Sequence, residues 1–295
     1  MREGFQGVYV ALLTPYTEEG QVNCVELKKL VRYLIGKGAD GFYVGGSTGE
    51  AFLLTQEERK KILEAVLEAN NGEKKVIAHV GQISTGLACD LARHAAYAGA
   101  DAVSAVAPFY YPFSQNEVRD YYVDIMDAAG LPMFVYNFPG ASGFTLTPSL
   151  LDELCDLGDV AGVKFTHNNF FHMEIMRRNH PELTIWSGVD QMLASGLIAG
   201  ADGTIGSSYN IICPIAKTVL ESVQTGDIAR AREYQTKINQ VISLSTSCGT
   251  RHVTGVKAVL ELEGFRMGPS RKPFASLQEV ARADIQLLYD SFVKQ

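Results

Sequence analysis

The chain alternates short apolar runs with longer segments whose apolar residues follow helical spacing. Between residues 24 and 37, Leu27, Leu30, Val31 and Leu34 recur at the spacing of one helix face. The short runs are almost wholly apolar, which is typical of strands buried in a parallel sheet. They cover residues 8–13, 41–44, 76–80, 102–106, 133–137, 160–166, 183–187 and 203–207. Strict strand–helix alternation through eight units predicts an α/β protein with a (β/α)8 barrel, the TIM-barrel fold.

The strand pattern stops at Pro214. Residues 214–295 predict about four helices, among them 228–244 and 277–293. We therefore expect a barrel over 1–213 and a C-terminal helical extension over 214–295 that belongs to the same domain. No low-complexity tract or linker separates the two parts.

Composition narrows the possible partners. The chain has 295 residues, 46% of them hydrophobic, which suits one barrel with a full core. A net charge of −7 without a lysine or arginine cluster argues against nucleic acid and against an anionic membrane surface. No apolar run reaches the length of a signal peptide or a membrane span. Five scattered cysteines without a CxxC pair predict reduced thiols in the cytoplasm, and neither they nor the six histidines show a familiar metal spacing.

One lysine interrupts an otherwise apolar strand. Lys164 lies near the end of the run 160–166, where valine or isoleucine would be ordinary. In one interpretation it pairs with a carboxylate or reaches solvent. In the other it is a desolvated amine that attacks a carbonyl carbon and forms a Schiff base, since burial can lower the pKa of a lysine by ~3, toward 7.

Polar residues gather where the predicted strands end. Parallel strands of a barrel direct their carboxyl ends to one mouth, where active sites of this fold lie. Residues distant in sequence therefore become neighbours of Lys164, which favours the reactive interpretation. These residues are Ser47, Thr48, Tyr110, Tyr136, Thr166, Gly188, Asp190, Gly206 and Ser207.

Two of these features suggest specific chemistry. The turn Gly45-Gly46-Ser47-Thr48-Gly49 is either a plain tight turn or an anion-binding nest of backbone N–H groups with two hydroxyls. With Lys164 opposite, a 2-keto acid fits: the nest takes its carboxylate and the amine takes its ketone. Tyr136 either packs in the barrel or transfers a proton, and a nearby cation is expected to lower its pKa.

Together these motifs resemble a known superfamily along essentially the whole chain. They are Gly46-Ser47-Thr48-Gly49-Glu50, Tyr136-Asn137-x-Pro139, Gly162-Val163-Lys164, and 200–203 with 208–210. The pattern is similar to that of the pyruvate-dependent class I aldolases of the dihydrodipicolinate synthase/N-acetylneuraminate lyase superfamily. Segments 49–52, 108–114 and 271–274 are most similar to its N-acetylneuraminate lyases.

The resemblance implies an activity and roles for individual residues. It implies reversible cleavage of N-acetylneuraminate to N-acetylmannosamine and pyruvate by a homotetramer that needs no metal or other cofactor. Lys164 would form the Schiff base and Tyr136 would move the proton. Ser47 and Thr48 would hold the carboxylate, with Tyr110 assisting from a neighbouring subunit. The residues implied to contact the sugar chain are Thr166, Gly188, Asp190, Gln191, Gly206 and Ser207.

The chain also departs from patterns in the superfamily. Gln191 stands where these lyases usually carry glutamate, and segment 249–255 is longer than their pattern. The synthases place an arginine after Tyr-Asn-x-Pro-Gly to bind a second carboxylate, but here Ala141 follows Gly140. Two alternatives stay open: an aldolase of the same superfamily acting on another keto-deoxy-sugar acid, and a non-catalytic sensor of sialic acid or pyruvate.

Overall fold

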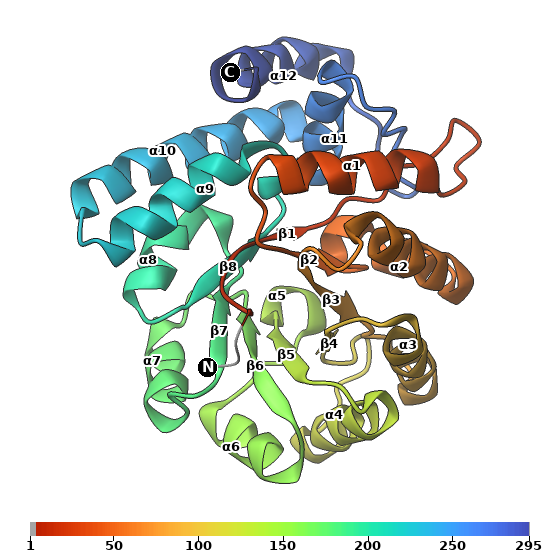
Figure 1. The fold of residues 1–295 in the computed structure, drawn as a ribbon, viewed down its shortest axis with the longest axis vertical. Helices are drawn as coiled ribbons and strands as arrows, with labels where there is room; N and C mark the ends of the chain where they lie inside the picture. The colour runs from red at the N-terminus through yellow and green to blue at the C-terminus, as the bar shows by residue number, and fades with distance from the viewer. Residues whose placement is uncertain (1–3, 295) are drawn as a thin grey trace.

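A computed structural model describes residues 4–294 of the chain, and its centre is a closed parallel barrel (Figure 1). The strands pair in sequence order and β8 closes the ring on β1. Their bounds are β1 Gly7–Ala11, β2 Gly41–Val44, β3 Lys75–His79, β4 Ala102–Val106, β5 Met133–Asn137, β6 Val160–Phe165, β7 Thr184–Ser187 and β8 Gly203–Gly206. The predicted (β/α)8 fold is confirmed.

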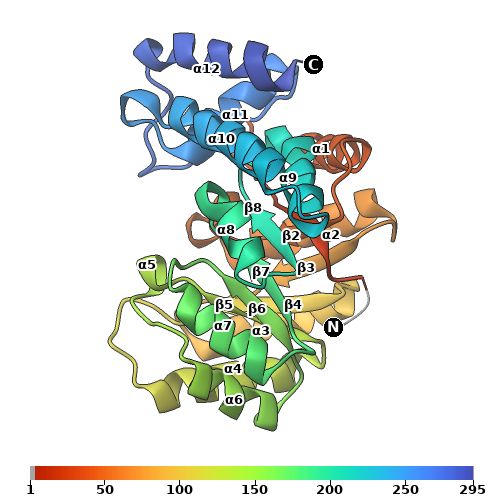
Figure 2. The ribbon, with the colours of Figure 1, turned by 90° about the vertical axis from the view of Figure 1, so that its left-hand side faces the viewer.

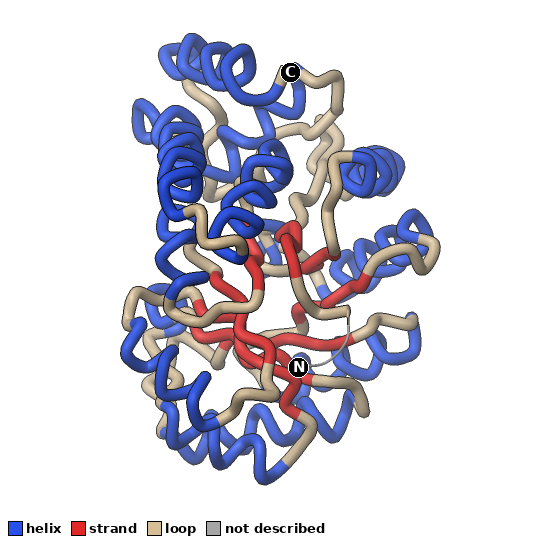
Figure 3. Tube along the Cα trace, turned by 60° about the vertical axis from the view of Figure 1, so that its left-hand side comes forward, coloured by secondary structure: helices blue, strands red, loops and turns tan. Residues whose placement is uncertain are grey.

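Helices surround the strands, as the tube trace shows (Figure 3). Several begin where a side chain accepts a hydrogen bond from the first turn: Thr55 and Ser114 each form a capping box with the glutamate three residues later. The helices of the barrel are α1 Cys24–Gly36, α2 Gln56–Asn70, α3 Thr85–Ala98, α4 Gln115–Ala129, α5 Pro139–Ser142, α6 Pro148–Leu157, α7 Phe170–Asn179, α8 Leu193–Ile198 and α9 Tyr209–Gln224. None of the helices within residues 4–294 is both long and apolar enough to span a bilayer.

The C-terminal helices gather on one side of the barrel, next to α9 and α1 (Figure 2). They are α10 Ile228–Ser245, α11 His252–Leu262 and α12 Arg282–Leu288, the last continued by a π-helical turn, Tyr289–Val293. The helix predicted over 277–293 begins later, because Gln278 has an extended backbone and a short 3₁₀ turn precedes α12. The predicted boundary at 213/214 lies inside α9, near a kink at Ile212 that precedes Pro214.

Aromatic side chains fill the barrel interior. On β1, Val8 and Val10 pack outward against the helices, while Tyr9 and Ala11 belong to the inner cluster. The rings of Tyr9 and Trp186 lie with their centroids 4.4 Å apart. Because this packed core closes the centre of the barrel, a small molecule can enter only at an end, and the polar residues lie at the carboxyl ends of the strands.

Candidate active site

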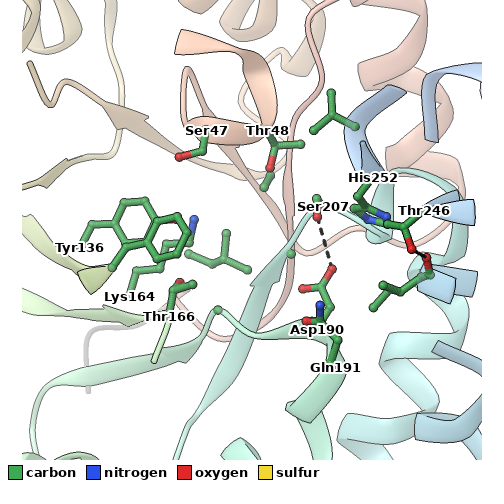
Figure 4. A pocket seen from close by; sticks show the side chains of 17 residues that line it. Ser47, Thr48, Tyr136, Lys164, Thr166, Asp190, Gln191, Ser207, Thr246 and His252 are labelled. Atoms are coloured by element: carbon green, nitrogen blue, oxygen red, sulfur yellow. Dashed lines mark hydrogen bonds between the residues drawn. The ribbon is translucent and has the colours of Figure 1, made fainter. Parts of the chain in front are cut away.

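A cavity of about 290 Å³ lies at the carboxyl ends of the strands (Figure 4). It brings together ten of the eleven residues predicted for the site: Ser47, Thr48, Tyr136, Lys164, Thr166, Gly188, Asp190, Gln191, Gly206 and Ser207. The polar side chains form two groups. We call them the lysine end, made of Ser47, Thr48, Tyr136, Lys164 and Thr166, and the aspartate end, made of Asp190, Gln191, Ser207, Thr246 and His252.

Lys164 is a buried amine among aromatic rings. Its side chain leaves β6 toward the barrel mouth, and only 5% of the residue is exposed. Nζ lies 4.0 Å from the ring centroid of Tyr43 and 4.0 Å from that of Tyr136. Burial lowers the pKa of Lys164 to about 7, and the Asp190 carboxylate opposes this only in part. A substantial fraction is therefore the free amine at neutral pH, which favours the reactive interpretation of this residue.

Tyr136 stands beside Lys164 on the neighbouring strand. The two residues are register partners in the β5–β6 pair. Burial raises the pKa of Tyr136 to about 12, although the nearby hydroxyls of Thr166 and Ser47 oppose the shift. The expectation that a neighbouring cation lowers this pKa is wrong, because desolvation of the phenolate has the largest effect and raises it. Tyr136 is thus a neutral phenol in the absence of substrate.

The turn after β2 has the shape of a small anion cradle. Gly45 has a positive φ of 71°, and a Cβ on Gly46 would lie only 2.7 Å from the ring of Tyr43, so both positions require glycine. Ser47 and Thr48 then open a 3₁₀ turn. The first N–H groups of such a turn lack partners within it and can meet an anion together with the two hydroxyls.

A buried ion pair fixes this turn from the C-terminal side. Glu50 follows the turn in the left-handed region, at φ 60°. Its fully buried carboxylate accepts a hydrogen bond from Lys257 Nζ of α11 at 2.7 Å and another from the Arg271 N–H at 2.8 Å. The position of Ser47 and Thr48 therefore depends on residues two hundred positions further along the chain.

His79 supports the same turn from β3, although no sequence pattern indicates this role. The backbone N–H of Val106 donates a hydrogen bond to His79 Nε2 at 3.3 Å. The proton of the imidazole is therefore on Nδ1, which donates to Gly45 O at 2.9 Å. Burial keeps the pKa of His79 well below its ordinary value. Arg59 Nη2 also donates to the His79 carbonyl at 2.6 Å.

At the aspartate end, the backbone approaches side chains closely. Asp190 is 6% exposed, and its Oδ2 accepts a hydrogen bond from the Ser208 N–H at 3.0 Å. A Cβ on Gly206 would collide with Asp190 Oδ1, and one on Gly188 would collide with Thr166 Oγ1. These glycines line the cavity because no other residue leaves room for the polar side chains beside them.

The C-terminal helices supply a wall that the sequence analysis did not assign. Ile242 and Thr246 come from α10 and its end, and His252 and Val253 from the start of α11; all four line the cavity. Phe138, whose ring stacks on Tyr136 at 5.6 Å, also lines it. The unusual length of segment 249–255 was the one sequence signal that could have indicated this wall.

Tyr110 is the predicted site residue that lies outside the cavity. It follows β4 in a loop, with φ 81° and 84% of its surface exposed. Its ring contacts that of Tyr111 at 5.0 Å. Within one chain Tyr110 does not meet Lys164, so the role implied for it depends on a second subunit.

Within residues 4–294, no three His, Cys, Asp or Glu side chains are grouped in a way that could hold a metal ion.

At the mouth of this (β/α)8 barrel, a buried lysine of lowered pKa lies beside a neutral tyrosine and an anion cradle. These are the groups that class I aldolase chemistry needs. The profile of the dihydrodipicolinate synthetase family matches residues 4–290. The chain belongs to this family, and the family prediction is confirmed.

Named relatives narrow the comparison. The chain is 46% identical over 281 residues to the N-acetylneuraminate lyase of Salmonella typhimurium, an alignment that covers 95% of this chain and 94% of the relative. The solved N-acetylneuraminate lyase from Fusobacterium nucleatum superimposes with a TM-score of 0.93 at 35% identity, covering 98% and 99% of the two chains. A catalytic-lysine mutant of the Ruminococcus gnavus sialic acid aldolase gives a TM-score of 0.96 at 30% identity, covering 98% and 97%.

Proposed function

We propose that this protein is a Schiff-base aldolase that cleaves N-acetylneuraminate reversibly to N-acetylmannosamine and pyruvate. The observation that carries the proposal is the buried Lys164 amine, with a pKa of about 7, in a cavity that continues to a second polar end. The lyases and the aldolase to which the chain is similar support the substrate. The catalytic lysine named for the Ruminococcus gnavus aldolase also supports a covalent mechanism.

Lys164 supplies the electron sink. Nζ attacks the C2 ketone of the sugar acid, water leaves, and an iminium forms. The electrons of the C3–C4 bond move into this iminium as the bond breaks, which gives an enamine and releases C4 as an aldehyde. Protonation of the enamine at C3 and hydrolysis then release pyruvate and restore the amine.

Tyr136 handles the proton of the C4 hydroxyl. Because Tyr136 is neutral at pH 7, it must give up its own proton as it takes one from the substrate. The hydroxyl of Ser47, which lies close enough to affect the pKa of Tyr136, and the substrate carboxylate held there provide the route. The carboxylate binds the 47–48 turn, and the hydroxylated chain extends toward Asp190 and Ser207.

An assay of three reactions tests this function. Purified protein is incubated with N-acetylneuraminate, with other keto-deoxy-sugar acids, and with aspartate semialdehyde plus pyruvate, and pyruvate release or consumption is followed. We expect turnover of N-acetylneuraminate and none of aspartate semialdehyde. The carboxylate of the semialdehyde would find no cation at Ala141 of α5, and an unpaired carboxylate is costly to bury. Preferred cleavage of another sugar acid, or binding without turnover, would replace the assignment with one of its two alternatives.

Removing the hydroxyl of Tyr136 should separate proton transfer from imine formation. In Tyr136→Phe we expect kcat to fall at least ~100-fold, the scale of a lost proton-transfer group. Reduction with borohydride in the presence of pyruvate should still label the protein, since Lys164 remains. Tyr97→Phe, which removes a hydroxyl from an exposed ring outside the cavity, is the matched control and should leave kcat unchanged. Near-normal turnover of Tyr136→Phe would reduce Tyr136 to a packing residue.

Gln191 should tolerate the residue usual in related lyases. It lies exposed at the edge of the cavity. Gln191→Glu changes one contact with a sugar hydroxyl from neutral to charge-assisted, worth about 1 kcal/mol in either direction. We therefore expect the KM for N-acetylneuraminate to change no more than ~10-fold with kcat little changed. A large loss of kcat, measured by initial rates, would show that Gln191 has a different role.

We further propose a homotetramer in which Tyr110 approaches the cavity of a neighbouring subunit. Exposed aromatic rings around the loop support a contact, since Tyr110 and Tyr111 lie at the surface and Phe52, 40% exposed, stacks edge-on against Phe109 at 4.6 Å. Sedimentation at micromolar concentration would contradict the proposal if it gave a monomer mass.

The five free thiols fit a reducing compartment, and we propose the cytoplasm.

A further inference from the structure

We infer that His252 is a positioning residue for the sugar chain of the substrate, acting through Ser208 and Asp190. The inference deepens the proposed function and rests on it. His252 is the first residue of α11 and faces the aspartate end of the cavity (Figure 4). It connects the C-terminal helices with the turn after β8, which carries Ser207 into the same end of the cavity.

The hydrogen bonds around His252 have one consistent direction. Ser245 Oγ donates to Ile242 O at 2.9 Å, so it must accept from His252 Nδ1, which lies 2.6 Å away. Burial lowers the pKa of His252 and so favours the neutral imidazole. With its one proton on Nδ1, the Nε2 atom is an acceptor, and Ser208 Oγ donates to it across 3.1 Å.

The chain of hydrogen bonds ends on a group that lines the cavity. Ser208 is fully buried, and its hydroxyl is hydrogen-bonded to His252. Its backbone N–H donates to Asp190 Oδ2 at 3.0 Å, and the Ser207 hydroxyl reaches the same oxygen at 3.5 Å. His252 thus fixes the turn that sets the direction of the Asp190 carboxylate. The carboxylate keeps lone pairs for hydroxyls of the substrate.

This arrangement predicts an effect on one half of the substrate only. Ser47, Thr48 and Lys164 do not belong to the chain of hydrogen bonds, so binding of pyruvate and imine formation should not depend on His252. Binding of the hydroxylated chain should depend on it, because a buried Ser208 hydroxyl without an acceptor allows the 207–208 turn to shift. The expected signature is a raised KM for the sugar acid with unchanged trapping of pyruvate.

Two matched variants separate the two hydrogen bonds of His252. In His252→Gln, the amide oxygen can reach the position of Nε2 and accept from Ser208. In His252→Asn, the shorter side chain can replace only Nδ1 and keeps the bond to Ser245. We expect His252→Asn to raise the KM for N-acetylneuraminate ~5–10-fold, the scale of one buried hydrogen bond, and His252→Gln to stay within ~2-fold of the parent.

A double-mutant cycle and a trapping assay complete the experiment. Ser208→Ala should raise the KM as His252→Asn does, and the double variant should be no worse than either, because both remove the same interaction. Labelling by borohydride and pyruvate should be equal in all variants, which also reports a folded site. A parental KM in His252→Asn, additive effects in the cycle, or a parallel loss of labelling would overturn the inference. Absence of N-acetylneuraminate turnover in the parent would instead overturn the proposed function, and this inference with it.

Discussion

Lys164→Ala should lower kcat for N-acetylneuraminate by ~10⁴-fold or more, the scale of losing a covalent nucleophile. No described side chain of the lysine end other than Lys164 is an amine, so no neighbour can take over imine formation. Borohydride with pyruvate should label the parent on the peptide that contains Lys164 and leave Lys164→Ala unlabelled. Mass spectrometry of the digested proteins measures the label on this peptide in the parent and its absence in Lys164→Ala. A reduced pyruvyl mass on another lysine would refute the mechanism.

Controls for this experiment come from pH and from a second lysine. Because the pKa of Lys164 is lowered to about 7, labelling should increase as pH rises from 5 through 7 and level off above ~8, where the amine is free. A lysine with an ordinary pKa would still gain reactivity well above this range. Lys217→Ala removes a lysine that pairs with Asp40 outside the cavity and should leave labelling unchanged.

Lys257→Met should destabilise the protein strongly, because it leaves the Glu50 carboxylate buried without its cation. Neither side chain of the pair is more than 3% exposed, and Lys257 Nζ lies 2.7 Å from Glu50 Oε1. Breaking such a buried pair from one side costs about 3–5 kcal/mol in the free energy of unfolding. Urea denaturation at pH 7 measures the loss. The Ser47–Thr48 turn should also loosen, so the KM for pyruvate in the synthetic direction should rise.

A compensating variant distinguishes an unpaired charge from lost packing. Glu50→Gln combined with Lys257→Met removes both charges and should recover much of the stability, since the carboxamide costs less to bury than a carboxylate. Lys237→Met breaks an exposed pair with Glu233 on α10 and should leave the urea midpoint near that of the parent. Equal losses in Lys257→Met and the double variant would mean that packing, rather than charge, causes the effect.

The architecture and most of the residues that line the cavity could be predicted because both depend on local pattern. Eight apolar runs separated by helical spacing admit few folds other than a closed parallel barrel. Once the fold is assumed, each strand end points to one mouth. Lys164 and Tyr136 therefore become neighbours by topology alone, and the β5–β6 register places them side by side.

Two aspects of the site depend on non-local packing and could not be predicted in this way. The approach of α10 and α11 to the mouth, which places Thr246 and His252 in the cavity, is set by helix packing that no spacing in the sequence records. The pKa of Tyr136 depends on a balance between desolvation, which raises it, and hydrogen bonds with the hydroxyls of Thr166 and Ser47, which lower it. The sequence indicates the cation, but the depth of burial, which decides the direction, requires the three-dimensional structure.

The late position of this cavity wall also has a consequence for how the protein acquires its reactivity during synthesis. The strands β5 and β6, which carry Tyr136 and Lys164, leave the ribosome before α10 and α11, which supply Ile242, Thr246, His252 and Val253. At ~5–20 residues per second, the segment 207–253 takes roughly 2–10 s to translate. During this interval the mouth lacks the wall formed by these four residues. All residues of the lysine end have by then been synthesised, whereas the aspartate end still lacks Thr246 and His252. The nascent chain therefore holds the groups for imine formation before the pocket for the sugar chain is complete, and discrimination between substrates is the last property that it acquires.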